Sequence, residues 1–129
     1  MSRDQVSPLK AVLGKGSAHE GGAHWLEERL GSAALLLLGL WFIASLLLLP
    51  ALDRATVVEW IKKPSAAVPM ALLIILVFRH AIDGIKVSID DYVHDGMNNL
   101  LLTMIVKFAG VAGMAFALFS LASIVFGAK

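Results

Sequence analysis

The feature that most constrains this chain is the stretch from Leu30 to Leu49, which contains no charged residue and is followed by Pro50. About 20 apolar residues suffice for a helix to cross about 30 Å of hydrocarbon. A secretory signal peptide has a shorter apolar core close behind a basic start, whereas this stretch begins only at Leu30. Because proline cannot continue a helix normally, the stretch predicts a retained transmembrane helix over residues 30–50.

The composition of the whole chain is also typical of a membrane protein. Of the 129 residues, 58% are hydrophobic and 16% are charged, and the mean hydropathy is +0.79. The net charge of +1 offers no excess for binding nucleic acid, so we expect contact with the lipid bilayer and none with nucleic acid. The chain has no cysteine, which excludes disulfides, cysteine-ligated iron–sulfur clusters and thiol nucleophiles.

Two further apolar stretches predict an all-α membrane protein with three transmembrane helices. The stretch from Ala66 to Phe78 is too short to span, so its helix must continue into the charged residues that follow. The stretch from Leu100 to Phe126 contains Lys107 as its one charge. We expect helices at about 30–50, 66–90 and 100–126 within a membrane anchor domain, residues 29–129.

Polar segments surround these helices. Residues 1–28 contain scattered charges and glycines without a sustained apolar period, and we expect a polar, mostly extended N-terminal tail. Residues 51–65 are expected to form a short surface loop. A slight excess of basic residues on the N-terminal side favours a cytoplasmic N terminus.

The segment 79–92 carries the candidate site. At 100° per residue, His80, Gly84, Val87 and Asp91 fall within about 40° of one direction and share one helix face. Tyr92 lies about 18 Å farther along the axis than His80, at 1.5 Å per residue. One group is therefore expected deep in the membrane and the other near its surface.

His80 has two interpretations. A neutral imidazole is the commonest protein ligand of metals and an axial ligand of haem iron, but a membrane histidine also hydrogen-bonds neighbouring helices. Gly84, one turn away, leaves room for the close approach of a bulky group or a backbone. A second axial imidazole would have to come from another chain, because no other histidine lies in an apolar stretch.

Tyr92 and Asp91 place a phenol beside a carboxylate at the expected membrane surface. A phenol can donate a hydrogen bond to a carbonyl oxygen and a carboxylate can relay protons, which suits a quinone that takes up two electrons and two protons. The alternative is that Tyr92 anchors the helix among lipid headgroups and the neighbouring aspartates form a solvated helix end.

Other charged residues near the spans have less specific interpretations. Arg29, where the tail meets the first helix, can hold a haem propionate, assist at the mouth of a quinone site or anchor the helix at headgroups. Arg79, Asp83 and Lys86 are spaced for mutual neutralisation, and no chemistry is assigned to them.

The sequence resembles the D-type hydrophobic membrane anchor of bacterial succinate dehydrogenase, respiratory complex II. The resemblance covers almost the whole chain, and it rests on Gly-Ser-Ala-His-Glu-Gly at residues 16–21, His24-Trp25 ahead of Arg29, Ser32-Ala33, and His80 followed by Gly84 and Asp91-Tyr92.

The resemblance implies a haem-binding bundle shared with a partner. His80 would be an axial ligand of haem b, opposite a histidine of a C-type cytochrome b556 anchor subunit. Tyr92, helped by Asp91, would line the ubiquinone site near the cytoplasmic surface of the bacterial inner membrane. Electrons from succinate would arrive through the flavoprotein and iron–sulfur subunits, so this chain would be a non-catalytic subunit that contributes to quinone reduction in the respiratory chain and the tricarboxylic acid cycle.

Two alternatives stay open at this point. The first is the anchor of a fumarate reductase, which uses similar quinone chemistry in reverse. The second is a small ion or proton transport subunit with a path along Arg79, His80 and Asp83. Transport predicts polar stripes on more than one helix, and the first and third apolar stretches carry few polar side chains.

Overall fold

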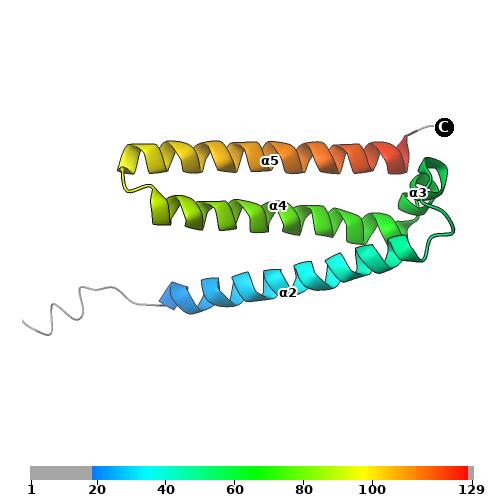
Figure 1. The fold of residues 1–129 in the computed structure, drawn as a ribbon, viewed down its shortest axis with the longest axis horizontal. Helices are drawn as coiled ribbons and strands as arrows, with labels where there is room; N and C mark the ends of the chain where they lie inside the picture. Colours follow the sequence, from blue (N-terminus) through cyan, green and yellow to red (C-terminus); the bar gives the residue numbers. More distant parts are fainter. Residues whose placement is uncertain (1–18, 128–129) are drawn as a thin grey trace, which may run out of the picture. The chain divides into compact units, whose positions relative to one another are not determined.

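The computed structural model describes residues 19–127, and the regular secondary structure within them is all α-helix. Three of the helices are long and apolar enough to cross a membrane. The predicted all-α fold with three spans is therefore confirmed for these residues, while residues 1–18 of the predicted tail lie outside the described part. The helices are α2 (His19–Leu47), α3 (Arg54–Ile61), α4 (Pro64–Tyr92) and α5 (Gly96–Phe126) (Figure 1).

Two boundaries differ from the expected ones. Helix α2 begins at His19, so residues 19–28, expected to be extended, are helical. Five of these ten residues, three glutamates, one alanine and one leucine, have high helix propensity, and the glutamates have it although they are polar. The expected loop 51–65 contains α3, an eight-residue helix.

The chain divides into two compact units, residues 1–30 and 31–129. In the described part of the first unit, the guanidinium carbon of Arg29 lies 4.6 Å from the centre of the Trp25 ring. The two residues are neighbours one helical turn apart, and a cation over an indole face is attracted by the ring electrons. Arg29 therefore has a stabilising contact within its own helix.

In the second unit, α4 and α5 run antiparallel side by side (Figure 1). A β-carbon built on Gly113 would lie 2.7 Å from Cε1 of Phe78, and one built on Gly110 would overlap the side chain of Ile82. Membrane helices approach closely where small residues line the contact. The two glycines therefore let the large side chains of α4 sit against the backbone of α5.

Helix α3 is capped and tied to the end of α2. The Asp53 carboxylate accepts hydrogen bonds from the Thr56 backbone nitrogen at 3.0 Å and from Thr56 Oγ1 at 2.8 Å. These bonds favour the charged form and hold the pKa of Asp53 below its ordinary value of 3.8. The ring of Trp60 lies 6.0 Å from that of Trp41 and 6.4 Å from that of Phe42, between centres. Aromatic contact therefore joins α3 to α2.

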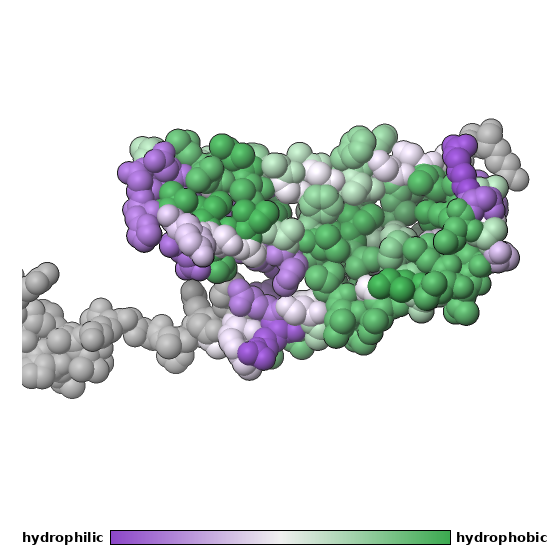
Figure 2. All heavy atoms as spheres, in the orientation of Figure 1, coloured by the Kyte–Doolittle hydropathy of each residue, from purple (hydrophilic) through white to green (hydrophobic). Residues whose placement is uncertain are grey.

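Most large apolar side chains point outward. Among the described residues only Ala66 and Ile89 are buried hydrophobics. Figure 2 shows hydrophobic residues in a broad band, with hydrophilic residues gathered at both ends of the α4–α5 pair. Exposed apolar surface of this extent is typical of a protein surrounded by lipid or by other subunits.

The contact at Gly110 predicts a specific cost. Gly110→Ala should lower thermal stability, because overpacking costs about 1 to 3 kcal/mol and outweighs a helix-propensity gain of about 1 kcal/mol. Thermal unfolding of the purified protein in detergent measures this. Gly39→Ala is the matched control, since a β-carbon there has nothing within 4 Å. Ile82→Ala in the Gly110→Ala background should recover stability, and failure to recover it would contradict this contact.

The Asp53 cap predicts a pH dependence. The folded pKa is lowered, so the contribution of the carboxylate to α3 is complete above the unfolded value and is lost as pH falls through the folded value. Hydrogen exchange of the α3 amides, corrected for intrinsic rates, should show protection falling below about pH 4. Asp53→Asn keeps a neutral capping oxygen and should remove this fall. An identical pH profile in Asp53→Asn would show that the carboxylate is not responsible.

Candidate functional site

Helix α4 presents two opposite faces. Phe78 and Ile82 contact the glycines of α5, and at 100° per residue the buried Ile89 lies on the same side. The predicted stripe lies on the other side, and all its members are exposed: His80, Gly84, Val87 and Asp91. We call this stripe the open face of α4. It is accessible because α5 packs against the opposite side of the helix.

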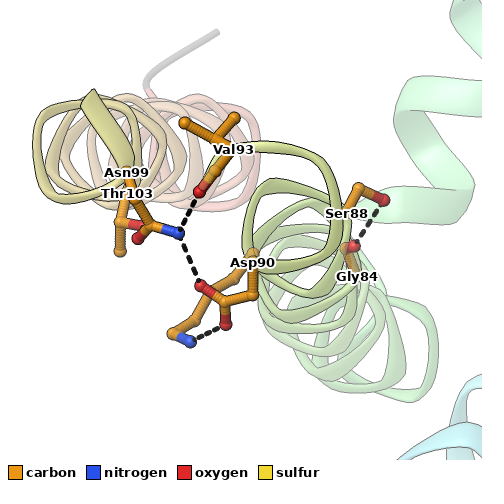
Figure 3. A network of polar contacts seen from close by, with 7 residues as sticks. Gly84, Ser88, Asp90, Val93, Asn99 and Thr103 are labelled. Carbon is orange, nitrogen blue, oxygen red and sulfur yellow. Dashed lines mark hydrogen bonds and ion pairs between the residues drawn. The ribbon is translucent and has the colours of Figure 1, made fainter. Parts of the chain in front are cut away.

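The open face has room around Gly84. A β-carbon built there would have nothing within 4 Å, so the expected close approach is not made by any described part of this chain. Ser88 Oγ donates a hydrogen bond to the Gly84 carbonyl oxygen at 3.2 Å (Figure 3). This bond satisfies the hydroxyl within the helix. The surface at Gly84 is therefore not covered by another side chain of the described residues.

Tyr92 and Asp91 occupy the last turn of α4. Tyr92 is 83% exposed, and Asp91 is exposed beside it. The helix ends here because Val93 adopts an extended conformation, while its nitrogen still donates to the Ile89 carbonyl at 2.8 Å. The phenol and the carboxylate thus lie where α4 turns toward α5, at one polar end of the helix pair.

A network of polar side chains holds this turn (Figure 3). Asn99 Nδ2, at the start of α5, donates to Asp90 Oδ1 at 3.1 Å and to the Val93 carbonyl oxygen at 3.4 Å. Thr103 Oγ1 donates to Asn99 Oδ1 at 3.5 Å, and Lys86 Nζ forms an ion pair with Asp90 Oδ2. The sequence reasoning missed Asn99 and Thr103. The sequence feature that could have indicated them is an amide side chain followed one turn later by a hydroxyl side chain, at the start of an apolar helix.

The charged residues of α4 pair differently from the expectation. Lys86 pairs with Asp90 rather than Asp83, and in the described part of the chain no ion pair joins Arg79 to Asp83. Asp90 is one full turn farther toward the helix end, where the flexible lysine stem reaches the more polar boundary. The expected mutual neutralisation of Arg79, Asp83 and Lys86 is therefore wrong for Lys86.

The candidate residues fall into separate places. His80, Gly84 and Asp91 lie on one face, with Tyr92 at its polar end, whereas Arg29 belongs to the other compact unit and is described there with Trp25. Among the side chains that the structure describes, no three of His, Asp or Glu gather in a way that could hold a metal ion. His80 offers a single imidazole donor.

Three long apolar helices and an open helix face with an imidazole and a terminal phenol define a multi-pass helical membrane subunit. Residues 3–123 match the family described as succinate dehydrogenase/fumarate reductase transmembrane subunit. The chain belongs to this family, and it is of the succinate dehydrogenase membrane anchor type. The resemblance seen in the sequence is thereby confirmed.

Individual relatives agree with the family match. The chain is 32% identical over 123 residues to the succinate dehydrogenase hydrophobic membrane anchor subunit of Paracoccus denitrificans, covering 95% of each chain. It is 32% identical over 117 residues to the subunit of the same description from Rickettsia bellii (strain RML369-C), covering 90% of this chain and 94% of the relative. No solved structure shows significant similarity.

Proposed function

We propose that this chain anchors succinate dehydrogenase in the bacterial inner membrane and, with a C-type cytochrome b556 anchor subunit, forms its haem and quinone sites. The observation that carries the proposal is the open face of α4, which exposes His80 and leads to Tyr92. A histidine in a span is costly unless it is used or paired. The partner anchor would cover this face and complete a site that one chain provides only in part.

The residues of the open face fit haem b. His80 offers an exposed imidazole, and a β-carbon built on Gly84 would meet no side chain of the described residues within 4 Å. His80 would hold the haem iron through its imidazole, together with a histidine of the C-type subunit. Haem b, when bound, supplies a one-electron carrier within the membrane. This chain contributes the position of the imidazole, with Arg29 as a candidate partner of a propionate.

Tyr92 and Asp91 suit a quinone at the membrane boundary. The exposed Tyr92 hydroxyl would donate a hydrogen bond to a ubiquinone carbonyl oxygen and thereby orient the ring. Asp91 would pass protons from water toward the reduced oxygens. Electrons would reach the site from succinate through the flavoprotein and iron–sulfur subunits, so the chain takes part in quinone reduction without oxidising succinate itself.

The order of the spans sets the expected orientation. If each of the three candidate spans crosses the membrane once, the segment before the first span and the connection between the second and third would lie on the same side. The excess of basic residues on this side favours the cytoplasm. Tyr92 would then lie near the cytoplasmic surface, where soluble subunits that oxidise succinate can dock.

A fumarate reductase anchor is the second candidate, because the family description names both enzymes. The same residues would serve a quinol that donates electrons. The relatives named above are succinate dehydrogenase anchors, which favours succinate oxidation. Membership in this family argues against the transport alternative.

The haem assignment is tested with His80→Ala in the complex purified with its co-expressed partner subunits. The reduced-minus-oxidised optical spectrum should lose the signature of bis-histidine haem b, because one axial donor is removed. His94→Ala is the matched control, since His94 is an exposed histidine outside the helices. Absence of haem from the unmodified complex, or unchanged ligation in His80→Ala, would rule out the assignment.

The quinone assignment is tested with Tyr92→Phe, which removes only the hydroxyl. Succinate-driven reduction of ubiquinone should fall by about tenfold, since loss of a hydrogen bond to the reacting carbonyl costs on the order of 1 kcal/mol or more. Succinate oxidation by a soluble artificial acceptor should stay near normal. Equal losses in the two assays would indicate a general defect and no quinone-specific role.

A further inference from the structure

We infer that Asn99 is a positioning residue for the quinone site, because its side-chain amide fixes the place where α4 ends and so the placement of Tyr92 and Asp91. The inference rests on the proposed quinone function of Tyr92. It assigns to α5 an indirect part in a site whose proposed quinone-contacting residues, Tyr92 and Asp91, lie on α4.

The contacts of Asn99 lie on both sides of the Asp91-Tyr92 pair. One amide hydrogen goes to the side chain of Asp90, just before the pair, at 3.1 Å, and the other goes to the carbonyl of Val93, just after it, at 3.4 Å. A single planar group thus bridges the residues that flank the phenol and the carboxylate (Figure 3). The last turn of α4 cannot unwind or extend without breaking one of these bonds.

The orientation of the Asn99 amide follows from its neighbours. Both groups on one side of it, a carboxylate and a carbonyl, are acceptors, so the NH2 group must face them. The amide oxygen is then directed to Thr103, whose hydroxyl donates to it at 3.5 Å. Lys86 holds the other oxygen of Asp90, so the carboxylate is fixed from two directions. Reversing the amide would set oxygen against oxygen at two contacts.

The hydrogen bonds of Asn99 lie at one end of the α4–α5 pair, where an apolar helix surface meets polar residues. At the boundary of an apolar layer, an unmade hydrogen bond to a carbonyl or a carboxylate costs more than in water. Asn99 is partly buried, whereas Tyr92 is exposed and its side chain makes no hydrogen bond to any residue that the structure describes. The position of the phenol therefore depends on the backbone beneath it, which Asn99 secures.

The test compares Asn99→Ala with Asn98→Ala in the assembled complex. Asn98 is the adjacent, exposed asparagine, and only its backbone nitrogen takes part in capping, toward Asp95 Oδ1 at 2.9 Å. Asn99→Ala should raise KM for a short-chain ubiquinone about three- to tenfold with a smaller change in kcat. It should also speed amide exchange over residues 90–95. Asn98→Ala should change neither quantity.

Two further measurements separate positioning from general damage. The complex purified through the Asn99→Ala anchor should oxidise succinate with a soluble artificial acceptor at the normal rate, which shows that the soluble subunits are attached and active. In a double-mutant cycle with Tyr92→Phe, Asn99→Ala should have little additional effect, because it acts through Tyr92. If Asn99→Ala does not assemble, Thr103→Val should raise KM in the same direction by a smaller factor, since it removes only the donor to the Asn99 oxygen.

The outcomes distinguish this inference from the proposed function. Normal quinone kinetics in Asn99→Ala, together with a defect in Tyr92→Phe, overturn the inference and leave the proposed function intact. Fully additive losses in the double mutant also overturn it. Normal quinone kinetics in Tyr92→Phe overturn the proposed function, and with it the quinone part of the inference. Faster amide exchange over residues 90–95 in Asn99→Ala would then show that Asn99 holds the end of α4 without serving a quinone site.

Discussion

The contact between α4 and α5 at Gly110 and Gly113 determines how the rest of this chain can be used. Because these positions lack side chains, Ile82 and Phe78 lie directly against the α5 backbone. Helices in lipid gain little from burying apolar surface, so close packing is the main source of their association. Once α5 occupies this side of α4, His80 and the rest of the open face must point away from it. Because one side of α4 packs against α5, the side chains on the opposite side are the ones left exposed for binding.

Polar groups in this chain are distributed according to what can satisfy them. At the α4–α5 turn, Lys86, Asp90 and Asn99 satisfy one another, so the cost of placing them beside the apolar layer is largely offset. At the opposite end, Asp53 caps α3 and Trp60 attaches this helix to α2. Both connections are therefore built from side chains with specific partners. The open face differs, because its imidazole and its terminal phenol have no partner in the described residues.

The three spans and the shared face of His80, Gly84 and Asp91 could be predicted because both depend on local quantities, the length of an apolar stretch and an angle of 100° per residue. The helical start of α2 was missed because polar composition was interpreted as absence of helix, although its three glutamates favour one. The Asn99 network was also missed. It joins residues across a turn, and which side of α4 meets α5 depends on glycines in a different helix.

The open face also affects the free energy of the chain before it assembles with a partner. An unpaired imidazole facing hydrocarbon raises the free energy of the separate subunit, whereas a companion that shields it removes this penalty. Recruitment of the companion and occupancy of the face are then thermodynamically linked, and each strengthens the other by the same factor. With the proposed companion over the open face, the chain would be more stable in the assembly than alone.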